Sequence, residues 1–329
     1  GVQLTWPHAA PGFGPWLDEV ETVFVAMAEA IARDGVVLIA CHDHATERRV
    51  RGLLARLAAA QVRTRITGSD DVWSRDHGPI TIWQGDHLEA LDFRFTGWGG
   101  KFSAERDDVI PTALAPEFQA GVRPIDFVLE GGAIESDGLG SILTTSSVLL
   151  NPNRNPGLDR AGAEAALRGY LGATRVLWLE HGHLEGDDTD GHVDTVARFC
   201  DPETIAYVRC DDPSDSHVAS FAAMERELQA LRTPSGAPYR LVPLPWPRAV
   251  VHDGARIPLT YANFLITDTQ VLVPTYRDPA DGLALARVAE CFPGRTIVAI
   301  DALPLVYQYG SIHCATMQLP RGLLRGALA

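Results

Sequence analysis

Lysine is almost absent from this chain. Only Lys101 occurs among its 28 basic residues, in a total length of 329 residues. Asp and Glu together number 42, so the formal net charge is −14. General nucleic-acid binding needs clustered positive charge to neutralise phosphates, and a protein this acidic lacks it. We therefore expect no nucleic-acid partner, and an acidic field favours a cationic small molecule instead.

Cysteine is also scarce, and its five positions carry no metal or redox spacing. No C-x-x-C pair occurs, which excludes a zinc ribbon and a thioredoxin-type motif. Few, widely spaced cysteines in a large chain are typical of a reducing compartment. No apolar run reaches about 18 residues, and the first residues lack the basic and apolar regions of a signal peptide. We therefore expect a cytoplasmic protein with no membrane segment.

Several common binding signatures are missing. Gly97–Lys101 superficially suggests a phosphate loop, but Phe95 stands where the first glycine should be. Asp187–Gly191 does not continue into a calcium loop, and His181 with His183 has no third ligand at a sensible spacing. No G-x-S-x-G nucleophile elbow is present. The sequence thus predicts neither a metal nor an organic cofactor.

The composition indicates a folded α/β or α+β protein. The hydrophobic fraction is 46%, and helical and strand-like periodicities alternate irregularly. Pro79–Trp83 and Leu88–Phe95 predict a hairpin, and Ser141–Leu150, Val193–Phe199 and Ile312–Gln318 predict strands. No linker is long enough to divide the chain, so we expect one catalytic domain over residues 1–329.

Two segments near the C-terminal half combine sharp turns with ionisable groups. Cys314 follows a Gly-Ser turn, where a thiol can be presented to a pocket. His192 and His313 are its candidate bases. On the predicted strand His192 and Asp194 would share a face, so both would point into one cavity.

Asp76 and Glu130 add further carboxylates to this set if the segments converge. So much negative charge suits a delocalised planar cation better than an ester or peptide carbonyl. A guanidinium presents five donors that carboxylates accept in pairs. The sequence therefore favours a guanidine as the substrate.

At these residues the chain resembles the agmatine deiminases and the Porphyromonas-type peptidyl-arginine deiminases of the guanidine-modifying superfamily. No single block is specific, but together the blocks span nearly the whole chain in the expected order. The matching segments are Leu4–His8, Trp73–Pro79, Phe95–Lys101, Glu130–Gly132, Asp187–Phe199 and Gly310–Pro320.

The resemblance implies a five-bladed α/β propeller (the pentein fold) of pseudo-fivefold ββαβ modules around a central active-site channel. It implies that Cys314 is the nucleophile, that His192 is the acid and then the base, and that Glu130 orients His192. Asp76 and Asp194 would grip the guanidinium nitrogens. Trp73 would form an aromatic wall beside the cation. No cofactor or metal is implied, and relatives often form homodimers.

The implied reaction is hydrolysis of agmatine to N-carbamoylputrescine and ammonia through a covalent amidino-cysteine, a step toward putrescine and the polyamines. Asp188 or Glu185 could receive the distal amine of agmatine, whereas an arginine carboxylate would need a cation such as Arg75 or Arg154. Deimination of peptidyl-arginine, free arginine or another alkylguanidine is the alternative.

Two departures from the family pattern lie in the nucleophile region. Met317 stands where a second glutamine is usual, and Tyr307–Gly310 replaces a glycine-rich run. Both bear on the substrate. Two further classes stay open, namely a cysteine amidase or peptidase and a non-catalytic guanidine or polyamine binder. Lys101 is expected to pair with a carboxylate near the Trp98 turn.

Overall fold

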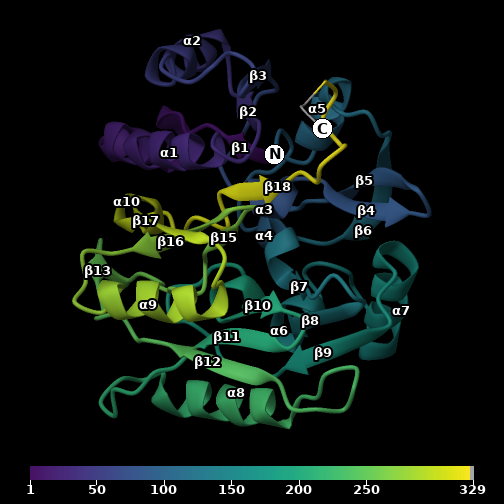
Figure 1. Ribbon diagram of the computed structural model, residues 1–329, viewed down its shortest axis with the longest axis vertical. Coiled ribbons are helices and arrows are strands. Elements are labelled where there is room, and N and C mark those ends of the chain that lie inside the picture. The colour runs from purple at the N-terminus through teal and green to yellow at the C-terminus, as the bar shows by residue number, and fades with distance from the viewer. Residues whose placement is uncertain (327–329) are drawn as a thin grey trace.

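The computed structural model describes residues 1–326 and shows an α/β fold. Five small sheets carry the strands, together with one separate two-stranded hairpin, β13 (Val251–His252) and β14 (Ala255–Arg256), within the described residues. Figure 1 shows the sheets arranged about the middle of the molecule. The expectation of an α/β architecture is confirmed.

Four of these five sheets consist of an antiparallel pair followed by a parallel neighbour, and the fifth has the same pattern with a second parallel strand added. Parallel pairing requires a crossover connection, which is why helices separate the last two strands of most sheets. The three-stranded sheets are β4 (Ile80–Gln84), β5 (His87–Arg94) and β6 (Val122–Val128); β7 (Ile134–Ser136), β8 (Ser141–Thr145) and β9 (Arg175–Leu179); β10 (Ala197–Asp201), β11 (Thr204–Val208) and β12 (Arg240–Leu244); and β15 (Leu265–Ile266), β16 (Gln270–Thr275) and β17 (Thr296–Asp301).

The remaining sheet joins the two ends of the chain. It contains β18 (Thr316–Gln318), β1 (Val2–Thr5), β2 (Val37–Cys41) and β3 (Val62–Ile66), in that order. The Gly1 amine also donates to the Leu319 carbonyl oxygen at 2.9 Å. Because β18 immediately follows the Cys314 turn, this pairing fixes the candidate nucleophile against the N-terminal part of the fold.

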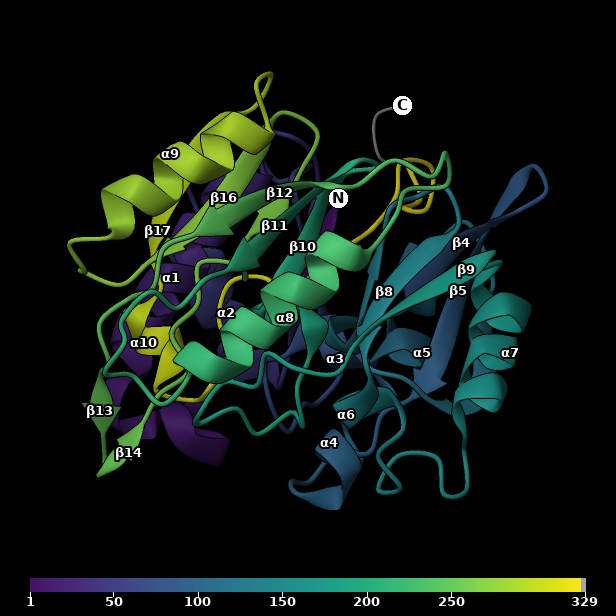
Figure 2. The ribbon, with the colours of Figure 1, turned by 90° about the horizontal axis from the view of Figure 1, so that it is seen from below.

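The longer helices cover the outside of the sheets (Figures 1 and 2). They are α1 (Leu17–Ile31), α2 (His44–Leu53), α7 (Arg160–Leu171), α8 (Val218–Ala230) and α9 (Asp281–Cys291). Asp43 and Asp159 cap α2 and α7 by accepting backbone N–H bonds. The shorter helices are α3 (Ser74–His77), α4 (Gly97–Gly100), α5 (Ile110–Leu114), α6 (Ser146–Leu149) and α10 (Leu303–Val306). Within residues 1–326 no helix has the length and apolarity to span a bilayer.

The predicted hairpin is present as β4 and β5, but three predicted strands differ from the structure. β8 ends at Thr145, and Ser146–Leu149 forms α6. Val193–Thr195 is a 3-10 turn, and β10 begins only at Ala197. Residues 312–315 form a turn, so Cys314 precedes β18 rather than lying in it. Apolar runs buried in turns have the same composition as short strands, which explains these errors.

Candidate active site

Turns from four of the sheets bring the predicted site residues to one place. Asp76 lies on α3, and Glu130 ends the segment after β6. His192 precedes the 3-10 turn before β10, and Asp194 lies within that turn. Cys314 lies in the turn before β18. The prediction that His192 and Asp194 share one face of a strand is wrong, because this segment is a turn. The turn nevertheless brings both side chains close to the other site residues. All five of these side chains are buried.

A pocket that opens to solvent is lined at its inner end by Trp73, Asp76 and Cys314, whereas Glu130, His192 and Asp194 lie behind this lining. Its outer lining includes Asp71, Asp188, Phe102 and Tyr309. Asp71 and Phe102 were not anticipated, although Asp71 directly precedes the Trp73–Pro79 segment. No lysine or arginine lines this pocket among the described residues.

Cys314 is held by the side chain of Asn263, which the sequence analysis missed. Asn263 Oδ1 accepts the backbone N–H groups of His313 and Cys314, at 3.0 and 3.2 Å. The Cys314 Sγ lies 3.9 Å from Asp194 Oδ2. Burial, together with the negative charges of Asp194 and Asp76, raises the pKa of the Cys314 thiol well above its ordinary value. The thiol is therefore neutral until a positive charge enters the pocket.

His192 lies between two carboxylates. Its Nε2 is 2.9 Å from Glu130 Oε2, and its Nδ1 is 3.6 Å from Asp76 Oδ1. Burial lowers the pKa of His192, but the charges of Asp76 and Glu130 outweigh burial and raise it to about 9. The imidazole is thus a cation at neutral pH. Nδ1 has no hydrogen-bond partner among the described residues, so it is the nitrogen free to exchange a proton with a bound molecule.

Glu130 is fixed by Arg154. Arg154 donates from Nε to Glu130 Oε1 at 2.8 Å and from Nη2 to Oε2 at 3.0 Å. Burial raises the pKa of Glu130, but the hydrogen bond from His192 and the charges of His192 and Arg154 more than offset this and lower it overall. Glu130 therefore stays ionised and can hold the imidazolium in one orientation. Arg154 is engaged by Glu130 and does not line the pocket. The expectation that it could bind a substrate carboxylate is therefore not supported.

Asp76 and Asp194 are also fixed on one side. Asp76 accepts from the Gly132 N–H at 3.1 Å and from Trp98 Nε1 at 3.0 Å. Asp194 Oδ2 accepts from His313 Nδ1 at 2.7 Å, and Asp194 Oδ1 has no partner among the described residues. Burial raises the pKa of each aspartate to about 6, with the His192 charge acting in the opposite direction.

Two glycines permit the close packing around these groups. A Cβ on Gly132 would lie 2.5 Å from His192 Nδ1 and 2.9 Å from Asp76 Oδ1. A Cβ on Gly310 would lie 2.2 Å from the Trp73 ring. Both distances are too short for any side chain. Gly132 thus allows the His192 imidazole to pack against the backbone, and Gly310 does the same for the Trp73 indole.

Lys101, the only lysine of the chain, holds the loop that carries Asp188. Lys101 Nζ donates to the Asp188 carbonyl oxygen at 2.6 Å and pairs with Asp190 Oδ1 at 2.7 Å. Asp190 also pairs with Arg154. The expected pairing of Lys101 with a carboxylate is confirmed, and it connects the Trp98 turn to the pocket mouth.

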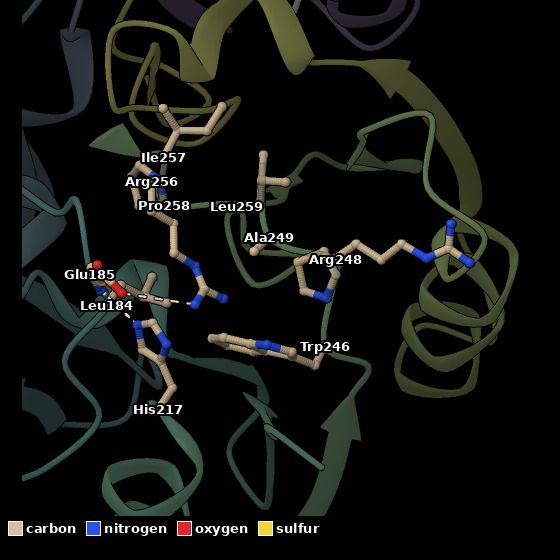
Figure 3. Close-up of a pocket in the computed structure, with 11 residues that line it drawn as sticks. Leu184, Glu185, His217, Trp246, Arg248, Ala249, Arg256, Ile257, Pro258 and Leu259 are labelled. Atoms are coloured by element: carbon tan, nitrogen blue, oxygen red, sulfur yellow. Dashed lines mark hydrogen bonds and ion pairs between the residues drawn. The ribbon is translucent and has the colours of Figure 1, made fainter. Parts of the chain in front are cut away.

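Asp71 and Asp188 place two carboxylates at the mouth. Burial raises the pKa of each to about 7, with the charge of Asp188 adding to the effect on Asp71 and the charge of Asp187 adding to that on Asp188. A cation between them would favour their ionised forms. Glu185, the other candidate amine receptor, instead lines a separate cavity. There Glu185 Oε2 lies 3.8 Å from Arg256 Nη1, with Trp246 beside them (Figure 3).

Arg75 is likewise turned away from the pocket. It is buried, and it donates to the Met317 Sδ at 3.4 Å and to Gln318 Oε1. It therefore supports the strand after the nucleophile. Met317, one of the two departures in this region, is a contact of this buried arginine and does not line the pocket. Gln308 and Tyr309, from the other departure, do line it.

Comparison with known proteins identifies the family of this chain. The model of the Porphyromonas-type peptidyl-arginine deiminase family matches residues 1–320. The chain belongs to this family. An agmatine deiminase of Stutzerimonas stutzeri is 34% identical, with 98% of this chain and 93% of the relative covered.

Solved structures of family members are similar over their whole length. A Porphyromonas gingivalis protein assigned as an arginine deiminase is 48% identical, with a TM-score of 0.92 and 98% and 96% of the two chains covered. A Campylobacter jejuni agmatine deiminase, in a Cys-to-Ser variant with substrate bound, is 32% identical with a TM-score of 0.89. That comparison covers 96% of this chain and 92% of the relative.

Proposed function

We propose that this protein is a hydrolase of guanidine C–N bonds, an agmatine deiminase that forms N-carbamoylputrescine and ammonia. The observation that carries this proposal is the pocket that joins the Cys314 thiol and Asp76 at its floor to Asp71 and Asp188 at its mouth. Asp194 lies directly behind the floor, with its Oδ2 3.9 Å from the thiol sulfur. Agmatine has a guanidinium at one end and an ammonium at the other. Both ends thus meet acidic groups, and curated relatives with that activity support the assignment.

The substrate's positive charge is the element that activates the nucleophile. Burial and then the charges of Asp194 and Asp76 raise the pKa of the Cys314 thiol, and a guanidinium bound beside the two aspartates offsets their charge. The Cys314 thiol then gives its proton to solvent, and the thiolate sulfur bonds to the guanidinium carbon as the C=N electron pair moves onto nitrogen. An amidase substrate brings no such charge, which argues against the cysteine amidase or peptidase alternative.

His192 supplies the two proton transfers that follow. The tetrahedral adduct breaks its C–N bond as the imidazolium gives its proton to the departing nitrogen, and ammonia leaves. The neutral imidazole next takes a proton from water, whose oxygen bonds to the carbon of the amidino-cysteine. Breaking the C–S bond returns the thiolate, the hydroxyl on the carbon gives its proton to solvent, and the ureido product is released. Glu130 holds the ring in place throughout.

Free arginine and peptidyl-arginine are the alternative substrates, and the 48% identical relative assigned as an arginine deiminase keeps them relevant. An α-carboxylate needs a cation at the mouth. Arg75 and Arg154 are both engaged behind the pocket, and the described lining holds no other arginine or lysine. Asp71 and Asp188 would repel such a carboxylate, so the mouth favours agmatine.

The finer architecture is part of the same proposal. The five sheets of like topology support a five-bladed propeller of ββαβ modules around the site, in a single catalytic domain. A pocket formed by turns from several sheets has the form expected of its central channel. We place the enzyme in the cytoplasm on its cysteine usage and acidic composition, and we propose a homodimer on family likeness alone.

The direct test compares ammonia and ureido-product release from agmatine, free arginine and a peptide with C-terminal arginine. Wild type and Cys314→Ala are assayed side by side. Agmatine turnover that disappears in the variant supports both the reaction and its nucleophile. Preferential turnover of arginine or the peptide would reject the substrate assignment, and tight agmatine binding without ammonia release would indicate a non-catalytic binder.

A further inference from the structure

His313, the residue before the nucleophile, is buried and has no part in the proton transfers described above. Its Nδ1 lies 2.7 Å from Asp194 Oδ2, and its Nε2 lies 3.0 Å from Arg198 Nη2. Its ring therefore links Asp194, the carboxylate beside the Cys314 thiol, to a buried arginine. A histidine beside a catalytic cysteine would ordinarily be a candidate base, so its actual role needs an explanation.

The direction of the two hydrogen bonds follows from the chemistry of the partners. A guanidinium has only donors, so His313 Nε2 must accept from Arg198. The single ring proton is then on Nδ1 and is donated to Asp194 Oδ2. Burial, followed by the positive charges of Arg198 and Arg75, lowers the pKa of His313 well below its ordinary value. The ring is thus neutral and in one tautomer, and its basic nitrogen is blocked by Arg198.

Arg198 cannot turn away from this contact. Its Nε donates to Glu135 Oε1 at 2.5 Å, and its Nη1 donates to the carbonyl oxygens of Ala262 and Phe264, at 3.0 and 2.6 Å. The guanidinium also lies 4.7 Å from the centre of the Phe264 ring. Arg198 is 2% exposed. Arg198 is therefore held in one position, and its hydrogen bond to Nε2 fixes the orientation of the His313 ring.

This arrangement assigns different tasks to the two oxygens of Asp194. Oδ2 is held by His313, and Oδ1 is buried with no partner among the described residues. We propose that Glu135, Arg198 and His313 form a positioning chain that holds Asp194 so that Oδ1 is presented to the substrate guanidinium. This inference rests on the proposed function of the pocket. His313 and Arg198 are positioning residues that act through Asp194.

The test uses two matched variants, His313→Leu and His313→Asn. Both remove the acceptor for Arg198, so they share any loss of stability from that cause. Only asparagine retains an amide N–H near the position of Nδ1 that can donate to Asp194. We expect His313→Leu to lower kcat/KM for agmatine about 100-fold, because small misplacements of substrate-orienting groups have effects of that size. We expect His313→Asn to restore most of the loss.

A pH profile separates positioning from general damage. Losing a donor to the charged carboxylate raises the Asp194 pKa, so the acid limb of kcat/KM should move up by about one pH unit in His313→Leu and stay near the wild-type value in His313→Asn. The charged and titratable groups that face Asp194 are the same in both variants. They are His192, Arg198, Glu135, Arg75, Asp76 and Cys314.

A second readout needs no guanidine at all, namely the rate of Cys314 alkylation by iodoacetamide. The rate is measured at a pH well above the raised Asp194 pKa, where the carboxylate is ionised in every variant. Without the His313 donor its charge then acts more strongly on the thiol at 3.9 Å, so alkylation should slow in His313→Leu but not in His313→Asn. Equal kcat/KM, acid limb and alkylation rate in the two variants would overturn the positioning chain. Failure of wild type to hydrolyse agmatine would instead count against the proposed function, and the alkylation comparison would still decide this inference.

Discussion

The floor and the mouth of the pocket are built in different ways. At and directly behind the floor, Asp76, Glu130, His192 and Asp194 are buried, and each is held by at least one hydrogen bond from the protein. At the mouth, Asp71 and Asp188 are only partly buried, and the aromatic rings of Phe102 and Tyr309 are exposed. On the proposed function, the floor carries out the bond changes at the guanidine, and the mouth discriminates between the groups attached to it.

The largest expected effect is at the floor, in Cys314→Ala. We expect kcat to fall by several orders of magnitude for every guanidine, because no other group can form the covalent intermediate. Steady-state ammonia release measures this. Cys210→Ala is the matched control, since Cys210 lies outside the pocket, and it should retain wild-type turnover. Substantial turnover in Cys314→Ala would show that the floor has been assigned wrongly.

His192→Gln should have the next largest effect. Loss of a general acid and base lowers kcat by about 10²- to 10⁴-fold. The variant keeps a side chain that can contact Glu130, so the fold and substrate binding should persist. Agmatine affinity measured by calorimetry in a Cys314→Ser background is the check. A loss of affinity that matches the whole loss of kcat/KM would contradict a proton-transfer role.

The ionisation of the floor predicts a bell-shaped pH dependence of kcat/KM. Asp76 and Asp194, with pKa values of about 6, become protonated as the pH falls and lose the guanidinium. His192, with a pKa of about 9, loses the proton needed by the departing nitrogen as the pH rises. Activity should therefore decline below about pH 6 and above about pH 9. A profile that keeps rising well above pH 9 would exclude the imidazolium as the acid.

Substitutions at the mouth should change selectivity more than chemistry. Asp71→Asn and Asp188→Asn each remove one charge facing the substrate's distal ammonium, so we expect KM for agmatine to rise about 10-fold with a small change in kcat. Simple alkylguanidines without the amine should be little affected. Glu185→Gln is the control, because Glu185 lines the other cavity. If KM rose equally for agmatine and for an alkylguanidine, the mouth carboxylates would not be acting on the distal ammonium, and the proposed division of roles between mouth and floor would be wrong.

The smallest effect is expected from Lys101→Met. The lysine pairs with Asp190 and with the Asp188 carbonyl oxygen, but its side chain is 35% exposed. Partly exposed ion pairs contribute little, so we expect only about a 3-fold rise in KM for agmatine and no change in kcat. Lys101→Arg should restore part of the loss. A large fall in kcat would mean that the Asp188 loop also positions the floor.

The sequence could predict the floor because its residues lie in contiguous blocks that combine glycine turns with ionisable side chains. The sequence could not predict the residues that hold these side chains in place. Arg154 and Arg198 reach Glu130 and His313 from other sheets, and Asn263 reaches the Cys314 turn from the segment before β15. Such partners are set by the tertiary fold and have no local pattern. Phe102 at the mouth was missed for the same reason.

The errors in secondary structure have a related physical cause. Val193 and Ile312 are buried apolar residues in turns, and their neighbours suggested strands. At a site formed where sheets meet, short turns are buried as fully as strands are. Both are therefore rich in apolar residues, and their composition does not distinguish them. The hairpin of β4 and β5 was predicted because its turn residues, Gln84–Asp86, have a signature of their own.

The covalent step is the central claim, and one measurement tests it most directly. Wild-type enzyme is mixed with agmatine, quenched in acid within the first turnover, and its intact mass and peptides are measured. The account predicts an adduct on Cys314 whose mass equals agmatine minus ammonia, absent from Cys314→Ala. Agmatine turnover with the adduct on another residue, or with equal turnover by Cys314→Ala, would contradict it.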